Sequence, residues 1–398
     1  MSTHYDIAIV GAGPVGLLLG CLLGARGFRV LIVDRRVQPR AHSQAIGITP
    51  PSLEILAQVG LDAEFIQRGV CIRDCHVHGQ SGYLGCASFR TIAGEYRYIL
   101  SLPQQVNVEL LEAKLAEHPQ VTLKRGIEVT QLDQSPDHVT LRANGLAATA
   151  KWVIGCDGHR SRVRELIQLR TRGGNYACHF LMGDFTDRTG LDDEAHLFFT
   201  AAGAVESFPL PEGKRRWIVQ TETAMPDAPR GYICKVVSQR AAYELQVEDQ
   251  LNQSSFTPRW LDCARYQVGR VILCGDAAHL MSPIGGQGMN TGWADAEFIT
   301  EMLAAIEHRA QLAAPLLAAY ERCRRSAARA ATQRAARGMW LGTRTGHFSS
   351  ALRDLCMRHL LFKGPLSGRI GPHFAMQTIP NGTVQQVPAR VWQTTPLR

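Results

Sequence analysis

The 398-residue sequence has no apolar stretch long enough to cross a bilayer, which takes about 20 consecutive apolar residues. Its longest apolar run, Leu17–Leu23, is much shorter, and Asp6 with the glycine-rich turn after it argues against a secretory signal. The eleven cysteines include no CxxC pair and are odd in number, which favours free thiols over a disulfide framework. We therefore expect a soluble, cytoplasmic protein.

Acidic residues are in the minority, because 43 Lys and Arg oppose 35 Asp and Glu and give a formal net charge of +8. Such a balance attracts anionic partners, including nucleotides, carboxylate substrates, nucleic acid and membrane surfaces. The arginines of 322–337 spread widely around a helical wheel with alanines between them, which is typical of a solvated helix. We expect no nucleic-acid partner, while peripheral membrane contact stays open.

The start of the chain has the pattern of a β-α-β unit. Two short apolar runs, Tyr5–Val10 and Arg29–Val33, flank a nearly continuous apolar stretch at Pro14–Arg26. This order of elements is typical of a doubly wound α/β sheet. Further strands are expected at Lys151–Ile154 and Val271–Leu273, and further helices at about 288–308, 316–337 and 347–361.

Residues 71–100 and 176–267 have a different pattern, with short alternating runs separated by glycine and proline, as in Ala204–Leu210 and Arg216–Thr221. This pattern favours a mostly antiparallel sheet, which we expect to be the substrate-binding domain. The predicted fold is α/β, with this sheet inserted into a Rossmann-like nucleotide-binding domain. That domain would be discontinuous (1–70, 101–175 and 268–345), and 346–398 would form a C-terminal helix and tail.

The first chemical motif is Gly11-Ala12-Gly13-Pro14-Val15-Gly16, between the first strand and the first helix. Gly11 permits a tight turn, Gly13 lets a pyrophosphate approach the backbone, and Gly16 allows close helix–strand packing. Pro14 fits the first helical position, and the helix N-terminus offers amides to phosphates. Asp34 ends the second strand, where its carboxylate can accept from a ribose hydroxyl and disfavours a 2′-phosphate. The motif predicts a dinucleotide without separating FAD from NAD.

The second motif is Gly155-Cys156-Asp157-Gly158, followed by an arginine cluster at 160–164. Asp-Gly is typical of a strand-to-helix turn. The arginines are either solvated or directed at the phosphates of a bound dinucleotide, and the sequence leaves both readings open.

The third motif runs from Gly275 to Asn290 and is the most informative. Asp276 at a strand end can bind a polyol chain, and the glycine-rich turn that follows lets backbone amides and a helix N-terminus reach a flat ligand. Reduced flavin carries negative charge at N1–C2=O, which such a helix end stabilises. Only a flavin needs both a ribityl partner and a helix end beneath a ring, so the dinucleotide is predicted to be FAD.

The three motifs together resemble those of the class A flavoprotein monooxygenases, which are built like p-hydroxybenzoate hydroxylase. Pro39-Arg40-Ala41 and Ala45-Ile46-Gly47, leading into 52–56 and 60–61, resemble the phenol-hydroxylase branch. The resemblance covers about residues 1–345 and implies that branch without its thioredoxin-like C-terminal domain. It also implies bound FAD, with NAD(P)H as transient reductant and O2 as the oxidant.

The resemblance implies a cofactor-binding role for seventeen positions. Asp276 would hold the ribityl chain, the backbone of 288–290 would lie against the isoalloxazine, and Asp157-Gly158 would serve both FAD and NAD(P)H. Arg40 and Gln104 would contact the pyrophosphate, with Gln105 as the alternative to Gln104. The full set is Gly11, Gly13, Pro14, Val15, Gly16, Asp34, Arg35, Arg40, Gln104, Val129, Asp157, Gly158, Asp276, Pro283, Gly288, Met289 and Asn290.

The implied reaction is hydroxylation of a phenolic or quinone-like small molecule through a flavin C4a-hydroperoxide, in which the cofactor carries the difficult chemistry. The protein must exclude water, position the ring and deprotonate a phenolic substrate. No residue is assigned as that base, and a monomer or homodimer is expected. The candidates for the base are His42, His76, His78, Tyr96 and Tyr98.

Two other enzymatic hypotheses stay open. One is a ubiquinone-biosynthesis-like hydroxylase of a membrane-borne prenylated ring, since 347–361 resembles the short terminal helix of that group. The other is an FAD-dependent reductase or oxidase of an unsaturated lipid. A non-enzymatic flavin scaffold, or a flavin reduced by a partner reductase, would also bind FAD.

Two further classes are disfavoured. A halogenase needs an early lysine, and no lysine precedes Lys114; Trp217-Ile218-Val219 also departs from the halogenase signature. A zinc site at Cys71, Cys75, His76 and His78 would place the cysteines and histidines on opposite sides of a strand, so we expect no metal.

Overall fold

The structure, a computed structural model, describes residues 3–39, 45–283, 285–364, 366–380 and 384. It begins with strand β1 (Thr3–Val10), helix α1 (Pro14–Ala25) and strand β2 (Val30–Asp34), which confirms the predicted β-α-β unit. Ten of the twelve residues of α1 are buried, because neighbouring helices cover the side that the sheet leaves open.

An eight-stranded sheet carries this unit, with the order β19-β20-β11-β1-β2-β8 and with β10 and β9 added beside β11. Pairing is parallel from β20 through β8, and every residue of β2 is buried, as in a parallel sheet covered on both faces. The other strands are β8 (Val121–Arg125), β9 (Val129–Gln134), β10 (Val139–Ala143), β11 (Leu146–Gly155), β19 (Gln267–Val268) and β20 (Val271–Leu273).

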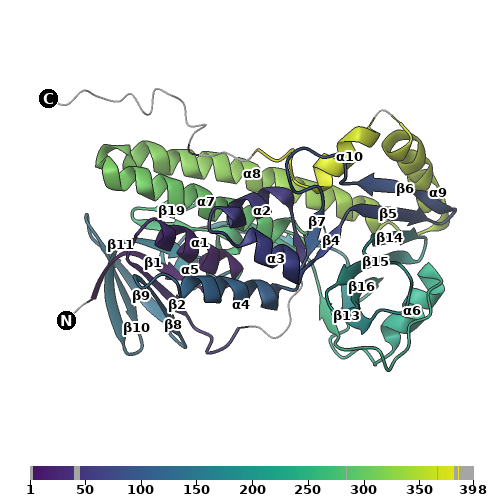
Figure 1. The fold of residues 1–398 in the computed structure, drawn as a ribbon, viewed down its shortest axis with the longest axis horizontal. Coiled ribbons are helices and arrows are strands. Elements are labelled where there is room, and N and C mark those ends of the chain that lie inside the picture. The colour runs from purple at the N-terminus through teal and green to yellow at the C-terminus, as the bar shows by residue number, and fades with distance from the viewer. Residues whose placement is uncertain (1–2, 40–44, 284, 365, 381–383, 385–398) are drawn as a thin grey trace.

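Two long helices, α7 (Gln287–His308) and α8 (Ala313–Gly342), pack against each other and run side by side along the molecule (Figure 1). Helix α7 also packs on α1, which in turn contacts α4 (Gln104–Leu115). Both long helices were predicted, and the shorter ones are α2 (Pro50–Ala57), α3 (Asp62–Arg68) and α5 (Arg162–Leu166).

A seven-stranded sheet has the order β17-β13-β16-β15-β14-β5-β6, and only the β14–β5 pair is parallel. Strands from 71–100 therefore pair with strands from 176–267 in one sheet, while the division of the whole chain into domains stays a prediction. The strands are β5 (Asp74–Gly79), β6 (Gly82–Ser88), β13 (His179–Thr186), β14 (Ala195–Thr200), β15 (Gly203–Leu210), β16 (Lys214–Thr221) and β17 (Ser254–Phe256).

The two faces of this sheet have different neighbours. On one face, Val205 and Trp217 pack against α6 (Tyr232–Ala241), and we call it the α6 face. On the other, Phe180 forms a cluster with Cys178 and Met339 of α8, and Ile218 packs against this cluster; we call it the α8 face.

Two three-stranded sheets join the large ones. Sheet β3-β7-β4 consists of β3 (Gly47–Ile48), β7 (Ile99–Ser101) and β4 (Val70–Ile72). Sheet β12-β18-β21 consists of β12 (Thr171–Asn175), β18 (Arg259–Cys263) and β21 (His279–Leu280), and a short 3-10 turn, η1 (Gly275–Ala277), precedes β21.

The C-terminal region is more helical than predicted. Helix α9 (His347–Cys356) and the π-helical segment η3 (Met357–Phe362) cover the predicted helix, but α10 (Ser367–Phe374) forms where we expected a tail. Gly368 and Pro372 made this stretch read as irregular, yet Ile370 and Ala375 are buried against the seven-stranded sheet and hold the helix there. In the described part of the chain, no helix combines the length and apolar character needed to cross a membrane.

Candidate cofactor site

The three predicted motifs meet at one edge of the eight-stranded sheet. The parallel register aligns Val10 with Gly155, and Gly155 with Leu273, so the turns after β1, β11 and β20 lie side by side. The crevice outside the carboxyl ends of parallel strands is where ligands of such folds bind.

The first turn is tight at both ends and open in the middle. Gly11 has φ +112°, and a Cβ there would lie 2.3 Å from the carbonyl oxygen of Cys156. A Cβ at Gly16 would lie 2.0 Å from the carbonyl oxygen of Gly11. A Cβ at Gly13 would meet no atom within 4 Å. The turn thus packs against the sheet while leaving room beside Gly13, as a pyrophosphate cradle requires.

Asp34 fixes this turn from the next strand. Its buried carboxylate accepts from the backbone N–H of Ala12 and of Arg36, both at 2.8 Å. A carboxylate has about four acceptor sites, so capacity for a ribose hydroxyl remains.

Two further predicted positions lie near the end of β2. Val129 is buried at the start of β9, and the turn before it is tied to β2 because the N–H of Ile127 donates to the carbonyl of Asp34 at 2.9 Å. Arg35 is largely exposed and lies 4.0 Å from Glu128, a contact too loose and too solvated to fix its position.

Arg125 is a residue near the turn that sequence reasoning missed. It is the register partner of Asp34, and its guanidinium donates to the carbonyl of Ala12 at 3.4 Å and to Glu112 on α4. It belongs to no local motif, and only the position of β8 beside β2 brings it to this edge.

Asp157 has an acceptor without a partner. Its Oδ2 accepts from the N–H of Val163 at 3.0 Å, whereas its Oδ1 is buried and has no hydrogen-bond donor among the described residues. Burial raises the pKa of this carboxyl. Gly158, with φ +77°, leaves open space beside it. An orphaned acceptor next to open backbone fits the hydroxyl groups of a bound cofactor.

Within the arginine cluster after Asp157, we left open whether the side chains are solvated or directed at phosphates. The position of Arg164 agrees with neither prediction. This residue is buried and donates to the carbonyls of Ala277 at 2.9 Å and His159 at 2.8 Å. It thereby ties the second turn to the third, and it is neither solvated nor directed at phosphates. Arg162 is exposed and pairs with Glu165.

A buried ion cluster supports the third turn from below. Asp295 accepts from the N–H of Gly275 at 3.0 Å and from Arg324 at 2.7 Å, and it lies 2.6 Å from Nε2 of His279. Burial alone would raise the pKa of Asp295, but His279 and Arg324 hold it below its ordinary value. The cluster sets the backbone around the half-buried Asp276.

The N-terminus of α7 is held by Asn290. Its Oδ1 accepts from the N–H of Thr49 at 3.0 Å, and its Nδ2 donates to the carbonyls of Gly47 at 3.0 Å and Gly286 at 2.6 Å. These bonds use both amide hydrogens of Nδ2 and one of the two lone pairs of Oδ1, so the side chain is committed to holding the turn. Met289 is fixed from α4, since Nδ2 of Asn107 lies 3.7 Å from its sulfur.

The remaining predicted cofactor positions are Gln104, Pro283 and Arg40. Gln104 is half-buried at the start of α4, whereas Gln105 is exposed and donates to Glu109 at 3.1 Å, which favours Gln104 at a cofactor. Pro283 is half-buried at the third turn. Arg40, like the base candidate His42, lies outside the described residues.

Two base candidates, His76 and His78, lie on the α6 face of the seven-stranded sheet. They pair in register with His196 and Phe198, and Phe198 packs in the cluster against α6. Nε2 of His78 is 3.1 Å from Nδ1 of His196, and Nδ1 of His76 is 3.3 Å from the hydroxyl of Tyr83. Both histidines thus point away from the α8 face.

The tyrosine candidates are poor proton acceptors. Tyr96 donates its hydroxyl to Asp62 at 2.7 Å, and burial raises the pKa of both Tyr96 and Tyr98. The suspected zinc ligands Cys71 and Cys75 lie on separate strands, β4 and β5, and within the described ranges no group of three possible ligands is suited to a metal.

Three features of this edge together define an FAD-binding α/β protein. They are a strand, glycine turn and helix, an acidic residue at the end of the next strand, and a second glycine-rich turn beside a helix N-terminus. Residues 4–335 match the sequence family described as FAD binding domain, and the chain belongs to that family.

Curated relatives with named activities are similar to this chain in sequence. A rifampicin monooxygenase of Streptomyces venezuelae is 32% identical over 73% of this chain and 62% of its own. A para-nitrophenol 4-monooxygenase of a Pseudomonas species is 27% identical over 77% of this chain and 79% of its own. This chain spans less than two thirds of the length of the first curated relatives, from 54% to 62%.

The fold of this chain matches that of solved structures. The crystal structure of a p-nitrophenol 4-monooxygenase from Pseudomonas putida superposes with a TM-score of 0.81 at 23% identity, covering 96% of this chain and 100% of that one. The predicted fold class is confirmed.

Proposed function

We propose that the protein is an FAD-dependent monooxygenase that hydroxylates a phenolic or quinone-like aromatic small molecule with O2 and NAD(P)H. The observation that carries the proposal is the convergence of the Gly11, Asp157 and Gly275 turns with the N-terminus of α7 at one sheet edge. The named activities of the relatives, which include rifampicin and para-nitrophenol monooxygenation, support it.

The cofactor would lie along this edge. The Gly11–Gly16 turn and Asp34 would hold the ADP part, Asp157 and Asp276 the hydroxyl-bearing chain, and the α7 N-terminus the ring. When bound, FAD supplies the hydride-accepting and oxygen-activating chemistry. The protein contributes the helix dipole at Gly286–Asn290, which stabilises negative charge on the ring, and a covering sheet that excludes water.

The division into domains follows from the same proposal. The segments 1–70, 101–175 and 268–345 would bind FAD, and 71–100 with 176–267 would cover the substrate. Residues 346–398 would flank the substrate sheet. Cytoplasmic location and a monomeric or dimeric state stay predictions.

Anaerobic mixing with NADH and with NADPH tests the proposal. We expect the flavin absorbance to bleach with at least one of the two, faster when an aromatic acid, phenol or quinone that acts as substrate is present. A flavin that stays oxidised with both would contradict reduction in place and point to a partner reductase or a non-enzymatic scaffold.

A specific surface favours a second candidate, the hydroxylase of a membrane-borne ring. Helix α9 and segment η3 expose an apolar stripe comprising Phe348 (85% exposed), Leu352 (54%), Leu355 (57%) and Leu360 (55%). Several large apolar side chains exposed side by side commonly mark an interaction site.

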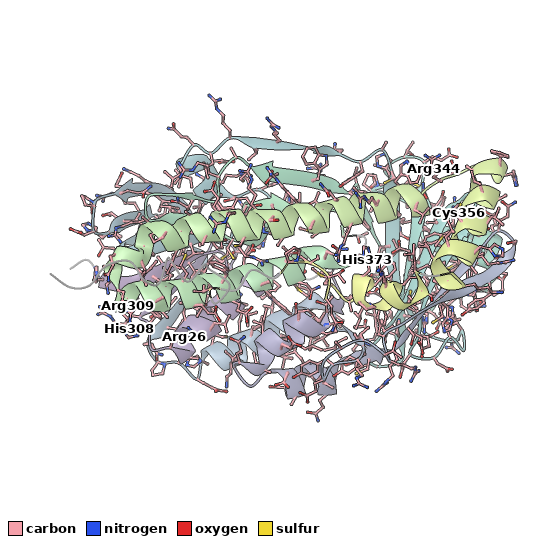
Figure 2. The ribbon with its side chains drawn as sticks, turned by 90° about the horizontal axis from the view of Figure 1, so that it is seen from above. Arg26, His308, Arg309, Arg344, Cys356 and His373 are labelled. Atoms are coloured by element: carbon pink, nitrogen blue, oxygen red, sulfur yellow. The ribbon has the colours of Figure 1, made fainter. Side chains whose placement is uncertain are left out.

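The charges beside the stripe indicate its partner. The only acidic residue of 344–374 is Asp354, which is buried and paired with Arg353 at 3.1 Å, while Arg344, Lys363 and Arg369 are exposed. Figure 2 shows Arg344 and Cys356 at the same end of the molecule, where α8 leads into α9. Apolar side chains with exposed basic residues fit an anionic lipid surface.

Flotation with vesicles containing phosphatidylserine separates the two candidates. An enzyme that takes its ring from a membrane should float with anionic vesicles and less with neutral ones. Recovery of all the protein at the bottom of the gradient with both would favour a ring substrate that is free in solution.

A further inference from the structure

Glu206 is a glutamate in the middle of the seven-stranded sheet. It lies on β15 between Leu197 of β14 and Ile218 of β16, its register partners. Its neighbours Val205 and Ser207 point to the α6 face, so Glu206 points to the α8 face, where only 8% of it stays exposed.

Glu206 differs from the other buried carboxylates in having no partner among the residues that the structure describes. Asp184 pairs with Arg216, Asp295 with Arg324, and Asp354 with Arg353. By contrast, no hydrogen bond or ion pair to Glu206 occurs within the described ranges. An unpaired buried carboxylate is costly, and proteins that keep one commonly use it at a functional site.

Two contacts place this sheet face beside the third turn. Ile218 packs against the cluster of Cys178, Phe180 and Met339. The sulfur of Met339 lies 3.7 Å from the hydroxyl of Ser282, immediately before Pro283. Glu206 is the register partner of Ile218 and is therefore one strand away from this contact.

The end of β15 is tied to the same region independently. The hydroxyl of Ser101 donates to the carbonyl of Pro209 at 2.6 Å, and Ser101 pairs in register with Gly47. The carbonyl of Gly47 in turn accepts from Asn290, which holds the N-terminus of α7. The seven-stranded sheet is thus linked both to the third turn at Ser282 and to the N-terminus of α7 at Asn290.

We propose that Glu206 is the catalytic base that accepts the hydroxyl proton of a phenolic ring held between the α8 face of the sheet and the flavin. In this step the phenol O–H bond breaks, its electron pair stays on the ring oxygen, and the proton moves to the carboxylate. The inference rests on the proposed function and narrows its substrate to rings that carry an ionisable hydroxyl.

The electrostatic surroundings suit this role. Burial raises the pKa of Glu206 to about 7, which poises the group between its two forms near neutral pH. The groups on the same face are the Cys75 thiol, whose own pKa burial raises, and the Arg216–Asp184 pair. The Arg353–Asp354 pair packs against this face from α9.

Glu206→Gln removes the proton acceptor with little change in shape, and Glu222→Gln removes the same charge from an exposed position just after β16. For each variant, kcat/KM is measured against pH with a panel of simple phenols whose own hydroxyl stays protonated across the neutral range, so that the profile reports the enzyme. Flavin content and melting temperature report folding, and Glu206→Asp shows whether a shorter carboxylate rescues the rate.

In wild type and Glu222→Gln, we expect kcat/KM to fall about tenfold per pH unit below about pH 7, since only ionised Glu206 accepts a proton. In Glu206→Gln we expect a rate lower by a factor on the order of 10² to 10⁴ and no inflection near pH 7. Binding of 4-nitrophenol to the oxidised holoenzyme gives a second readout, at a pH below the pKa of the free ligand, where unbound nitrophenol is neutral. Bound nitrophenol should then show more absorbance of its anion in wild type than in Glu206→Gln.

An unchanged pH profile in Glu206→Gln, or equal anion absorbance in both proteins, would overturn the role of Glu206 and leave the proposed function standing. If wild type reduces its flavin but no phenol stimulates NAD(P)H oxidation, the proposed function itself fails, and Glu206 with it.

Discussion

The unpaired state of Glu206 predicts a pH-dependent cost to stability that is independent of catalysis. Burial raises the pKa of its carboxyl to about 7 in the folded chain, from the ordinary value of 4.5 that applies to the unfolded chain. Below about pH 4.5 both states hold the proton, so Glu206 contributes nothing to the difference. As the pH rises from there to about 7, the unfolded chain ionises while the folded chain does not, and stability falls.

The size of the cost follows from the shift. About 2.5 pH units at 1.36 kcal/mol each amount to about 3 kcal/mol above pH 7. Since glutamine does not ionise, the Glu206→Gln variant should match wild type near pH 4.5 and gain about 3 kcal/mol by pH 8.

Urea unfolding of the FAD-loaded protein across this pH range measures the effect, with Glu222→Gln as the control for loss of an exposed charge. Wild type and Glu206→Gln share all other titrating groups, so the difference between their free energies of unfolding isolates Glu206. A difference that stays constant with pH would refute the argument, because it would mean that the carboxylate finds a partner or water in the folded state.

Three further predictions concern the cofactor edge and the surface. Gly13→Val should leave the melting temperature of the apoprotein unchanged but lower FAD affinity at least about tenfold, measured by flavin retention, because the added atoms enter the open space beside the turn. Asp295→Asn should cost about 3–5 kcal/mol in urea unfolding, whereas Asp133→Asn at an exposed pair should cost less than about 1 kcal/mol. Equal costs would contradict a supporting role for the buried cluster. Phe348→Glu should reduce flotation with anionic vesicles, whereas Val37→Glu, also at an exposed apolar position, should not. Flotation that both changes reduce equally would argue against α9 as the membrane contact.

The parts of the fold with local signals could be predicted from sequence. The β-α-β unit follows from the apolar pattern at 5–33 and from Pro14 at the start of a helix. Strand β20 and helix α7 follow in the same way from an apolar run and from glycines at the helix start. Each signal lies within a few residues of the element that it predicts.

Features that depend on strand order could not be predicted. Arg125 reaches the first turn only because β8 lies beside β2, and the register of β14, β15 and β16 is what places Glu206 on the α8 face beside Ile218. The buried position of Arg164 could not be predicted, because its backbone acceptor, Ala277, is more than a hundred residues away. The helix α10 depends on packing against the seven-stranded sheet, which outweighs its glycines and proline.

Monooxygenation is tested by following the oxygen atoms of O2 into the products. The FAD-loaded enzyme is turned over with NAD(P)H, isotopically labelled O2 and the phenol from the panel that most stimulates NAD(P)H oxidation. We expect one labelled oxygen atom in the ring product and one in water. A product without label, with all the labelled oxygen recovered as hydrogen peroxide or water, would contradict monooxygenation.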